Sequence, residues 1–356
     1  MSATTGITVA VDAMGGDHAP DAVVAGAVTA VESRGCRVIL VGRRDAVETS
    51  LRRCVQPPDL ERVRSRIEVF EASEVVEMDE HPAQAVRAKR DSSIVRACEL
   101  AAQGRAQAVV SAGNSGAVLA AALFTLRRIP GIARPAIGAL LPGRDDARTF
   151  LLDVGANADV RAEWLAQFAV MGSVYARTMM GVADPRVALL SNGEEPGKGS
   201  ALIQAAHPLL AAAPIRFTGN IEGRDLLSGR CDVAVTDGFT GNVALKTAEG
   251  VGEYLFAVLR HEARTSRRAM LGGLLLKPRL RAVRDRVDYR ATGGALLLGV
   301  AGEVVIAHGR SDATAIDNAI GVAATAVQHH VSGTIAAAMP REVVTPALAA
   351  TTEDQS

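Results

Sequence analysis

Several residue types are scarce in this chain of 356 residues, and each scarcity argues against a class of protein. Phe, Trp and Tyr make up only 3% of the residues, so the core must be built from Ala, Val, Leu and Ile. The four cysteines (Cys36, Cys54, Cys98 and Cys231) form no C-x-x-C pair, which favours buried reduced thiols over zinc or disulfides. The formal net charge is zero, which argues against a nucleic-acid protein recruited by bulk positive charge.

Targeting signals are also missing from the sequence. No apolar stretch approaches the roughly 20 residues that a membrane-spanning helix needs. The N-terminus lacks a basic region followed by an apolar one, so we do not expect secretion. The sequence therefore predicts a cytoplasmic protein that is soluble or lies on a membrane surface. Hydrophobic residues make up 48%, enough for a sizeable core in one large or two medium domains.

The usual signatures of nucleotide, serine-hydrolase and metal chemistry are absent. Gly15-Gly16 lacks the G-x-G-x-x-G spacing, and the glycines around Lys198 lack the spacing of a phosphate-binding P-loop. There is no G-x-S-x-G elbow, and no histidine–carboxylate cluster has metal-ligand spacing. We therefore expect chemistry that uses no nucleotide, no serine nucleophile, no metal and no cofactor.

Strand-like and helix-like segments alternate along the chain, which predicts an α/β fold with a mostly parallel sheet and helices on both faces. The expected strands cover residues 7–11, 37–42, 67–71, 108–111, 149–153, 187–191 and 233–236. The expected helices include residues 22–33, 82–102 and 161–180. Residues after about 340 lack periodicity, which is typical of a mobile tail.

Five of the expected strands end in polar, glycine-rich loops: residues 12–18, 111–116, 153–159, 191–199 and 236–242. Parallel strands place these loops at one edge of a sheet, so we expect all five to gather there. Glycine permits close backbone approach and helix N-termini offer unpaired N–H groups, which suits an anion such as phosphate. Each loop alone is also compatible with an ordinary turn. In the first loop, residues 12–18, Asp17 would then cap the next helix.

A set of long motifs points to a known family. They are residues 11–20, 111–117, 153–157, 191–195 with 197–199, 219–225, 236–243 and 308–312. On these motifs the chain resembles the bacterial phosphate acyltransferases of phospholipid synthesis, which convert acyl-acyl-carrier protein and inorganic phosphate into acyl phosphate and free carrier protein. The resemblance runs from residue 7 to about 325. It departs from the family pattern at Ser115, where threonine is expected, and in an extension beyond about residue 335.

The resemblance implies the fold and the partners. It implies a three-layer α/β/α sandwich like that of phosphotransacetylases and isopropylmalate-dehydrogenase-like enzymes. This sandwich would form one domain over residues 1–335, assemble as a homodimer and be followed by a mobile tail at 336–356. The product would pass to a membrane glycerol-3-phosphate acyltransferase. Phosphate is already anionic and nucleophilic, so it attacks the thioester directly, without a covalent enzyme intermediate.

The resemblance also implies roles for individual residues. Lysine occurs at only four positions, and Lys198 lies between two glycines, where a compact ammonium suits phosphate; the alternative is a solvated loop lysine. Asn242 suits the oxyanion, unless it only caps a helix that begins near residue 243. His18 and His308 suit a proton shuttle to the leaving thiolate, although a lone histidine is often structural. Lys246 follows Asn242 by one turn, where it faces the same site or pairs with Glu249.

The predicted site falls into two sets. The catalytic set is Lys198, Asn242 and His18. The substrate-binding set is Asp12, Gly15, Gly16, Asn114, Ser115, Asp153, Asn157, Glu195, Asp237, Thr240, Lys246, His308 and Asp312. We expect Asp12, Asp153 and Asp237 to orient hydrogen-bond donors rather than to act as bases.

Residues 250–290 differ from the rest of the chain, because short apolar runs alternate with arginines there. This pattern predicts a protruding amphipathic helical hairpin that lies on anionic lipid. The alternative is a hairpin buried in a dimer interface. The predicted membrane or carrier-protein contacts are Leu271, Leu274, Leu275, Leu276, Arg264, Arg267 and Arg268.

Two other functions are compatible with the sequence. One is a small-acyl phosphotransacetylase that uses acetyl-CoA on the same fold. The other is a membrane-bound scaffold that docks carrier protein through its arginines without catalysis.

Overall fold

The computed structural model describes residues 6–287 and 293–339, and its centre is one eleven-stranded sheet. The strand order is β3-β2-β1-β4-β11-β10-β5-β6-β9-β7-β8. The strands are β1 (Thr8–Asp12), β2 (Arg37–Gly42), β3 (Ile67–Glu71), β4 (Ala108–Ser111), β5 (Ala136–Pro142), β6 (Arg148–Leu152), β7 (Arg186–Leu190), β8 (Arg216–Ile221), β9 (Val233–Val235), β10 (Ala295–Leu298) and β11 (Glu303–Ile306).

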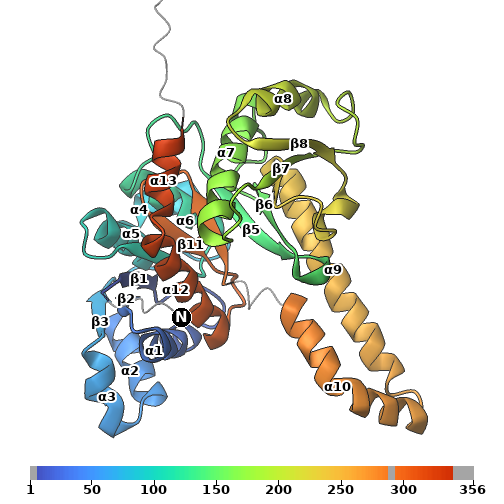
Figure 1. The fold of residues 1–356 in the computed structure, drawn as a ribbon. Coiled ribbons are helices and arrows are strands. Elements are labelled where there is room, and N and C mark those ends of the chain that lie inside the picture. The colour runs from blue at the N-terminus through green and yellow to red at the C-terminus, as the bar shows by residue number, and fades with distance from the viewer. Residues whose placement is uncertain (1–5, 288–292, 340–356) are drawn as a thin grey trace, which may run out of the picture.

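Helices cover both faces of this sheet (Figure 1), which confirms the predicted three-layer α/β/α sandwich. The α-helices of the described residues are α1 (Asp21–Arg34), α2 (Arg44–Cys54), α3 (Pro57–Arg64), α4 (Pro82–Ala88), α5 (Ser93–Ala102), α6 (Ser115–Thr125), α7 (Ala162–Met179), α8 (Ala201–Ala212), α9 (Gly238–Glu262), α10 (Arg267–Val287), α12 (Ala313–Gln328) and α13 (Val331–Ala338). Alternate strand residues enter two separate cores: Val9 and Val11 pack on one face and Ala10 on the other.

The direction of the strands changes in the middle of the sheet, and this corrects one expectation. Neighbouring strands are parallel except where β10 meets β11 and β5, and where β5 meets β6. As a result β6, β9 and β7 run opposite to β1, β4 and β11. Their C-terminal loops therefore lie at the opposite edge of the sheet, and the prediction that all five loops share one edge is wrong. The reversing strands β5 and β10 were not predicted from the sequence.

Two local predictions are also wrong. The helix expected over residues 82–102 is two helices, because Lys89 leaves the helical region (φ −98°, ψ 73°) and Ser92 begins the second one in extended backbone. Asp17 does not cap α1, whose N-cap is Pro20 without a side-chain hydrogen bond. At the other end of the chain, α13 continues to Ala338. The remainder of the predicted tail, residues 340–356, lies outside the described residues.

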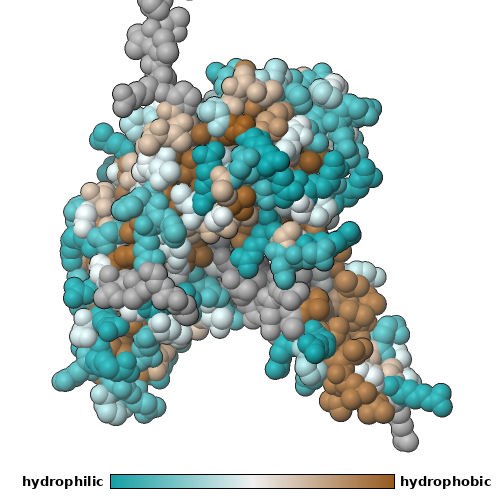
Figure 2. All heavy atoms as spheres, viewed as in Figure 1, coloured by the Kyte–Doolittle hydropathy of each residue, from teal (hydrophilic) through white to brown (hydrophobic). Residues whose placement is uncertain are grey.

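Helices α9 and α10 extend side by side away from the sandwich (Figure 1). Figure 2 shows hydrophobic side chains gathered over them, and Leu274 and Leu275 are 65% and 73% exposed. Within residues 6–287 and 293–339, no helix is both long and apolar enough to cross a bilayer. The function of this pair of helices stays a prediction. Arg267 begins α10, but the prediction for its side chain lies outside the described residues.

Candidate functional site

A cavity of about 930 Å³ lies between α9 and the middle of the sheet. This is within the roughly 300–1,000 Å³ typical of small-molecule sites. One wall is β5, which contributes Ile137 and the run from Ala139 to Pro142. The other wall is one face of α9 from Asn242 to Arg260. At 1.5 Å per residue, that face is about 27 Å long.

The start of α9 fixes this helix against the sheet. Asp237 is its N-cap: Oδ1 accepts the Thr240 amide at 2.7 Å and Oδ2 accepts the Thr240 hydroxyl at 2.7 Å. The helix thus begins at Gly238, and the alternative that Asn242 caps it is wrong. A Cβ on Gly241 would collide with the Asp153 carbonyl oxygen, so only glycine allows this close approach.

Asp153 organises the loop that follows β6. Its buried carboxylate accepts the amides of Ile137 (3.0 Å), Gly155 (3.1 Å), Ala156 (3.0 Å) and Asn157 (2.8 Å), and the Asn157 side-chain nitrogen at 2.9 Å. Burial raises the pKa of the Asp153 carboxyl, and the hydrogen bonds from Ala156 and Asn157 oppose this rise. Asp153 therefore holds the backbone of this loop through five accepted hydrogen bonds, and its role in a substrate site stays a prediction.

Asp12 has the same role at the opposite edge of the sheet. Its carboxylate accepts the Ser111 hydroxyl at 2.7 Å and the Met14 amide at 3.2 Å. Burial raises the pKa of the Asp12 carboxyl. A Cβ on Gly15 would lie 2.7 Å from the backbone nitrogen of Gly113 and 2.6 Å from the Asp12 Oδ2, so a side chain does not fit here without moving the backbone. The loops after β1 and β11 are joined, because the Asp17 amide donates to the Gly309 carbonyl at 2.8 Å.

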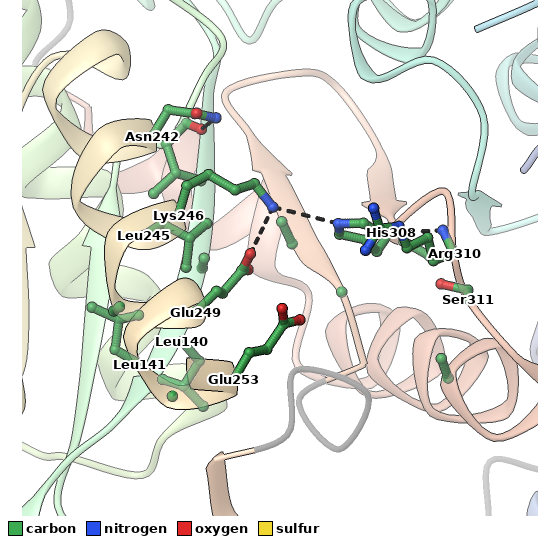
Figure 3. A pocket seen from close by; sticks show the side chains of 18 of the residues that line it. Leu140, Leu141, Asn242, Leu245, Lys246, Glu249, Glu253, His308, Arg310 and Ser311 are labelled. Atoms are coloured by element: carbon green, nitrogen blue, oxygen red, sulfur yellow. Dashed lines mark hydrogen bonds and ion pairs between the residues drawn. The ribbon is translucent and has the colours of Figure 1, made fainter. Parts of the chain in front are cut away.

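Helix α9 connects the two edges of the sheet within the cavity. Asn242 Nδ2 donates to the Val154 carbonyl at 3.0 Å, which ties the helix to the loop after β6. One turn later, Lys246 Nζ lies 2.8 Å from Glu249 Oε2 and 3.4 Å from His308 Nε2 in the loop after β11 (Figure 3). The predicted pair with Glu249 is therefore present, and Lys246 also lines the cavity; its role in a substrate site stays a prediction. The helix brings together loops that the strand directions would separate.

The structure divides the predicted site residues into two groups. Those that line the cavity are His18, Ser115, Asn242, Lys246, His308 and Asp312. Those that do not line it are Asp12, Gly15, Gly16, Asn114, Asp153, Asn157, Glu195, Lys198, Asp237 and Thr240. Several of the second group support the first: Asn114 is the N-cap of α6, directly before Ser115, and accepts the Ala117 amide at 3.2 Å. Lys198 and Glu195 are exposed in the loop after β7.

Sequence reasoning missed part of the lining. Glu253, Phe256 and Arg260 were not identified, although their spacing from Asn242 and Glu249 follows one helical face. The apolar run of β5 between Pro135 and Gly143 was a second available signal.

Charge is concentrated where the loop after β11 meets α9. The Arg310 amide donates to His308 Nδ1 at 3.1 Å. Burial, followed by the positive charge of Lys246, lowers the pKa of His308 below its ordinary value. Asp312 begins α12, where its carboxylate accepts the Ala315 amide at 2.9 Å. This end of the cavity is polar, whereas the walls formed by Leu140, Leu141 and Phe256 are apolar.

Known proteins resemble this chain over most of its length. Residues 7–334 match a family model described as "Fatty acid synthesis protein". A phosphate acyltransferase of Heliobacterium modesticaldum is 49% identical over 94% of this chain and 98% of its own. One from Anaeromyxobacter sp. is 52% identical over 93% of this chain and 90% of its own.

Solved structures agree in fold. A phosphotransacetylase from Streptococcus pyogenes superposes with a TM-score of 0.64 at 16% identity, covering 91% of this chain and 95% of its own. The EutD phosphotransacetylase of Staphylococcus aureus gives 0.58 at 18% identity, covering 91% and 96%. The solved structures show the fold alone, whereas the sequence matches also show the family. The chain therefore belongs to the phosphate acyltransferase family of fatty acid and phospholipid synthesis and is an acyltransferase.

Proposed function

We propose that this enzyme transfers a long-chain fatty acyl group from acyl carrier protein to inorganic phosphate. A phosphate oxygen attacks the thioester carbonyl carbon, so that a C–O bond forms and the C–S bond breaks. The electron pair leaves with sulfur, and the resulting thiolate takes up a proton. The products are acyl phosphate and free carrier protein, and no covalent enzyme intermediate forms.

The cavity combines a polar end with apolar surface, and this combination is the observation that supports the proposal. Its polar end gathers His18, Ser115 and Lys246, which suit an anionic nucleophile and a leaving thiolate. Beyond that end, Leu140 and Leu141 of β5 and Leu245, Phe256 and Ala257 of α9 add apolar surface beside the charged Glu249, Glu253 and Arg260, and this surface suits a chain much longer than acetyl. An acetyl group would leave most of this apolar surface in contact with water.

Asn242 suits the developing oxyanion. One N–H of its side-chain amide is held by the Val154 carbonyl, which orients the second N–H. One such donor stabilises the transition state by about 2.7–4 kcal/mol in comparable acyl transfers. His18, which is exposed and lines the cavity, suits protonation of the thiolate. Lys198 suits capture of phosphate outside the cavity, and this role stays a prediction.

The helix pair α9 and α10 supports a proposal about partners. Leu271, Leu274, Leu275 and Leu276 are each more than half exposed, and burying one of them fully contributes about 1.5–3 kcal/mol. Arg264, between α9 and α10, and Arg268, in α10, are exposed and suit anionic lipid or an acidic carrier protein. We infer a homodimer that attaches to the membrane surface and passes acyl phosphate to a glycerol-3-phosphate acyltransferase.

The test is a thioester assay with purified enzyme. Palmitoyl-carrier protein is incubated with and without inorganic phosphate, and hydroxylamine traps any acyl phosphate as hydroxamate. We expect phosphate-dependent release of free carrier protein together with hydroxamate. Release from acetyl-CoA but not from palmitoyl-carrier protein would replace the proposal with a small-acyl phosphotransacetylase. No release from either donor would favour a scaffold that docks carrier protein.

A further inference from the structure

The only tryptophan of the chain lies among exposed arginines at the start of α7. Trp164 is partly exposed, and the guanidinium carbons of Arg134 and Arg161 lie 5.1 Å and 5.7 Å from the centroid of its ring. Arg128 is also exposed and lies beside Arg134, because its guanidinium donates to the carbonyl of Ala133. We name these four residues, Arg128, Arg134, Arg161 and Trp164, the tryptophan patch.

Helix α7 holds the patch together. Gln167, on the turn after Trp164, accepts the Ala133 amide at 2.8 Å and donates to the Gly131 carbonyl at 2.9 Å. These two hydrogen bonds fasten the loop between α6 and β5, which carries the first two arginines, to α7. Arg161 is the N-cap of the same helix. The backbone positions of all three arginines are therefore fixed relative to the tryptophan ring.

The positive charges of the patch are not neutralised within the described part of the chain. No carboxylate there forms an ion pair with Arg128, Arg134 or Arg161, although Asp159 and Glu163 are close in sequence. Two guanidinium groups against one ring repel each other, and contact with the ring leaves their N–H groups available. Such N–H groups bind carboxylates, often through two parallel hydrogen bonds. Three arginines on two elements fit an acidic protein surface better than one small anion.

The patch borders the cavity without lining it. The carbonyl of Pro135, next to Arg134, accepts the Asn157 side-chain nitrogen at 2.7 Å. Asn157 is two residues from Gly155, which is exposed and lines the cavity. Ile137 also lines the cavity and is three residues from Arg134, at most about 11 Å along an extended chain. A protein bound to the patch would therefore lie beside the cavity, within reach of a flexible arm that enters it.

We propose that the tryptophan patch is the surface on which the acyl carrier protein docks. The proposal rests on the proposed function, and it identifies where the enzyme binds the protein partner of that reaction. A carrier protein holds its thioester at the end of a flexible prosthetic arm, so it must dock next to the cavity rather than inside it. Its acidic surface complements the three arginines, and this complementarity raises the rate of association.

The first experiment measures docking without turnover. Unacylated carrier protein that lacks tryptophan is titrated into the enzyme, and the fluorescence of Trp164 reports binding. Affinities are compared for the wild type, Arg134→Glu, Arg161→Glu and the control Arg52→Glu, which reverses an exposed arginine of α2. We expect affinity about tenfold weaker in each patch variant and changed by less than about twofold in the control. Added salt should weaken binding to the wild type more than binding to the patch variants.

The second experiment connects docking to catalysis. With palmitoyl-carrier protein as the donor, Arg134→Glu and Arg161→Glu should raise the KM about tenfold and leave kcat unchanged. With a palmitoyl thioester of N-acetylcysteamine, which has no protein to dock, the same variants should show the wild-type KM. Because the first experiment needs no acyl transfer, docking that is observed without any transfer would refute the proposed function and still support this surface.

Three results would overturn the proposal. The first is carrier protein that binds both patch variants, each with the unfolding temperature of the wild type, within about twofold of the wild-type affinity. The second is Trp164 fluorescence that responds to anionic vesicles but not to carrier protein, which would assign the patch to a lipid surface. The third is fluorescence that responds to dilution of the enzyme but not to carrier protein, which would assign the patch to a contact between two copies of this chain.

Discussion

Replacing Asp153 with asparagine should destabilise the protein and disturb the cavity. The carboxylate accepts five N–H groups, three on Oδ1 and two on Oδ2. Asparagine keeps one oxygen and places an amide nitrogen at the other position. The new side-chain amide can be placed in two orientations, and the one that keeps more hydrogen bonds leaves its oxygen facing the amides of Ile137, Gly155 and Ala156. Its NH₂ group then faces the backbone amide and the side-chain nitrogen of Asn157.

The magnitude follows from those two contacts. Each buried donor left without its acceptor costs about 1–3 kcal/mol, so Asp153→Asn should lower the free energy of unfolding by about 3 kcal/mol. For large domains this corresponds to a fall in unfolding temperature on the order of 5 °C. Since the loop also holds Val154, which anchors Asn242, kcat should fall as well.

Thermal unfolding measured by differential scanning calorimetry is the assay. Asp159→Asn is the matched control, because Asp159 lies on the same loop, is exposed, and undergoes the same change of charge. The control should unfold within about 1 °C of the wild type, as surface substitutions usually do. If Asp153→Asn unfolds at the same temperature as the control, the five hydrogen bonds do not hold the loop and the reasoning is wrong.

Four further predictions follow from the structure. Gly241→Ala should push α9 off the Asp153 carbonyl and lower both kcat and unfolding temperature, and normal values for both would contradict the close approach. Burial raises the pKa of Glu303 in the folded protein, so the free energy of unfolding should fall as pH rises from about 4.5 through the raised pKa. Glu303→Gln should lose less of this free energy over the same pH range. Identical pH profiles of wild type and variant would refute this. Lys198→Ala should raise the KM for phosphate without altering unfolding; unchanged kinetics would show that Lys198 does not capture phosphate. Leu275→Glu should reduce sedimentation with anionic vesicles, whereas equal binding would exclude this leucine from the lipid contact.

Much of the fold was predictable because the strands are short, apolar and bounded by polar loops. The predicted strands at 37–42, 67–71 and 108–111 match β2, β3 and β4. The reversal at β5 and β10 was not predictable in the same way. Strand direction depends on which neighbour a strand pairs with, and an apolar run such as residues 136–142 reads the same in either direction.

The site was predictable in its residue types but not in its arrangement. Gly241, Asp153 and Asn242 form one unit whose parts are distant in sequence, and only the close packing of α9 on the loop after β6 joins them. The contact between Lys246 and His308 depends on the same packing. Lys198 was identified from its flanking glycines, a local signal that does not report whether a side chain reaches a cavity.

The most direct test of the proposed reaction uses inorganic phosphate labelled with ¹⁸O. Wild-type enzyme is incubated with palmitoyl-carrier protein and labelled phosphate, and the products are weighed by mass spectrometry. Attack by phosphate on the thioester carbonyl predicts palmitoyl phosphate that retains every labelled oxygen of the phosphate, together with an equal amount of free carrier protein. Free palmitate released at the same rate without phosphate, and no labelled acyl phosphate, would contradict the account.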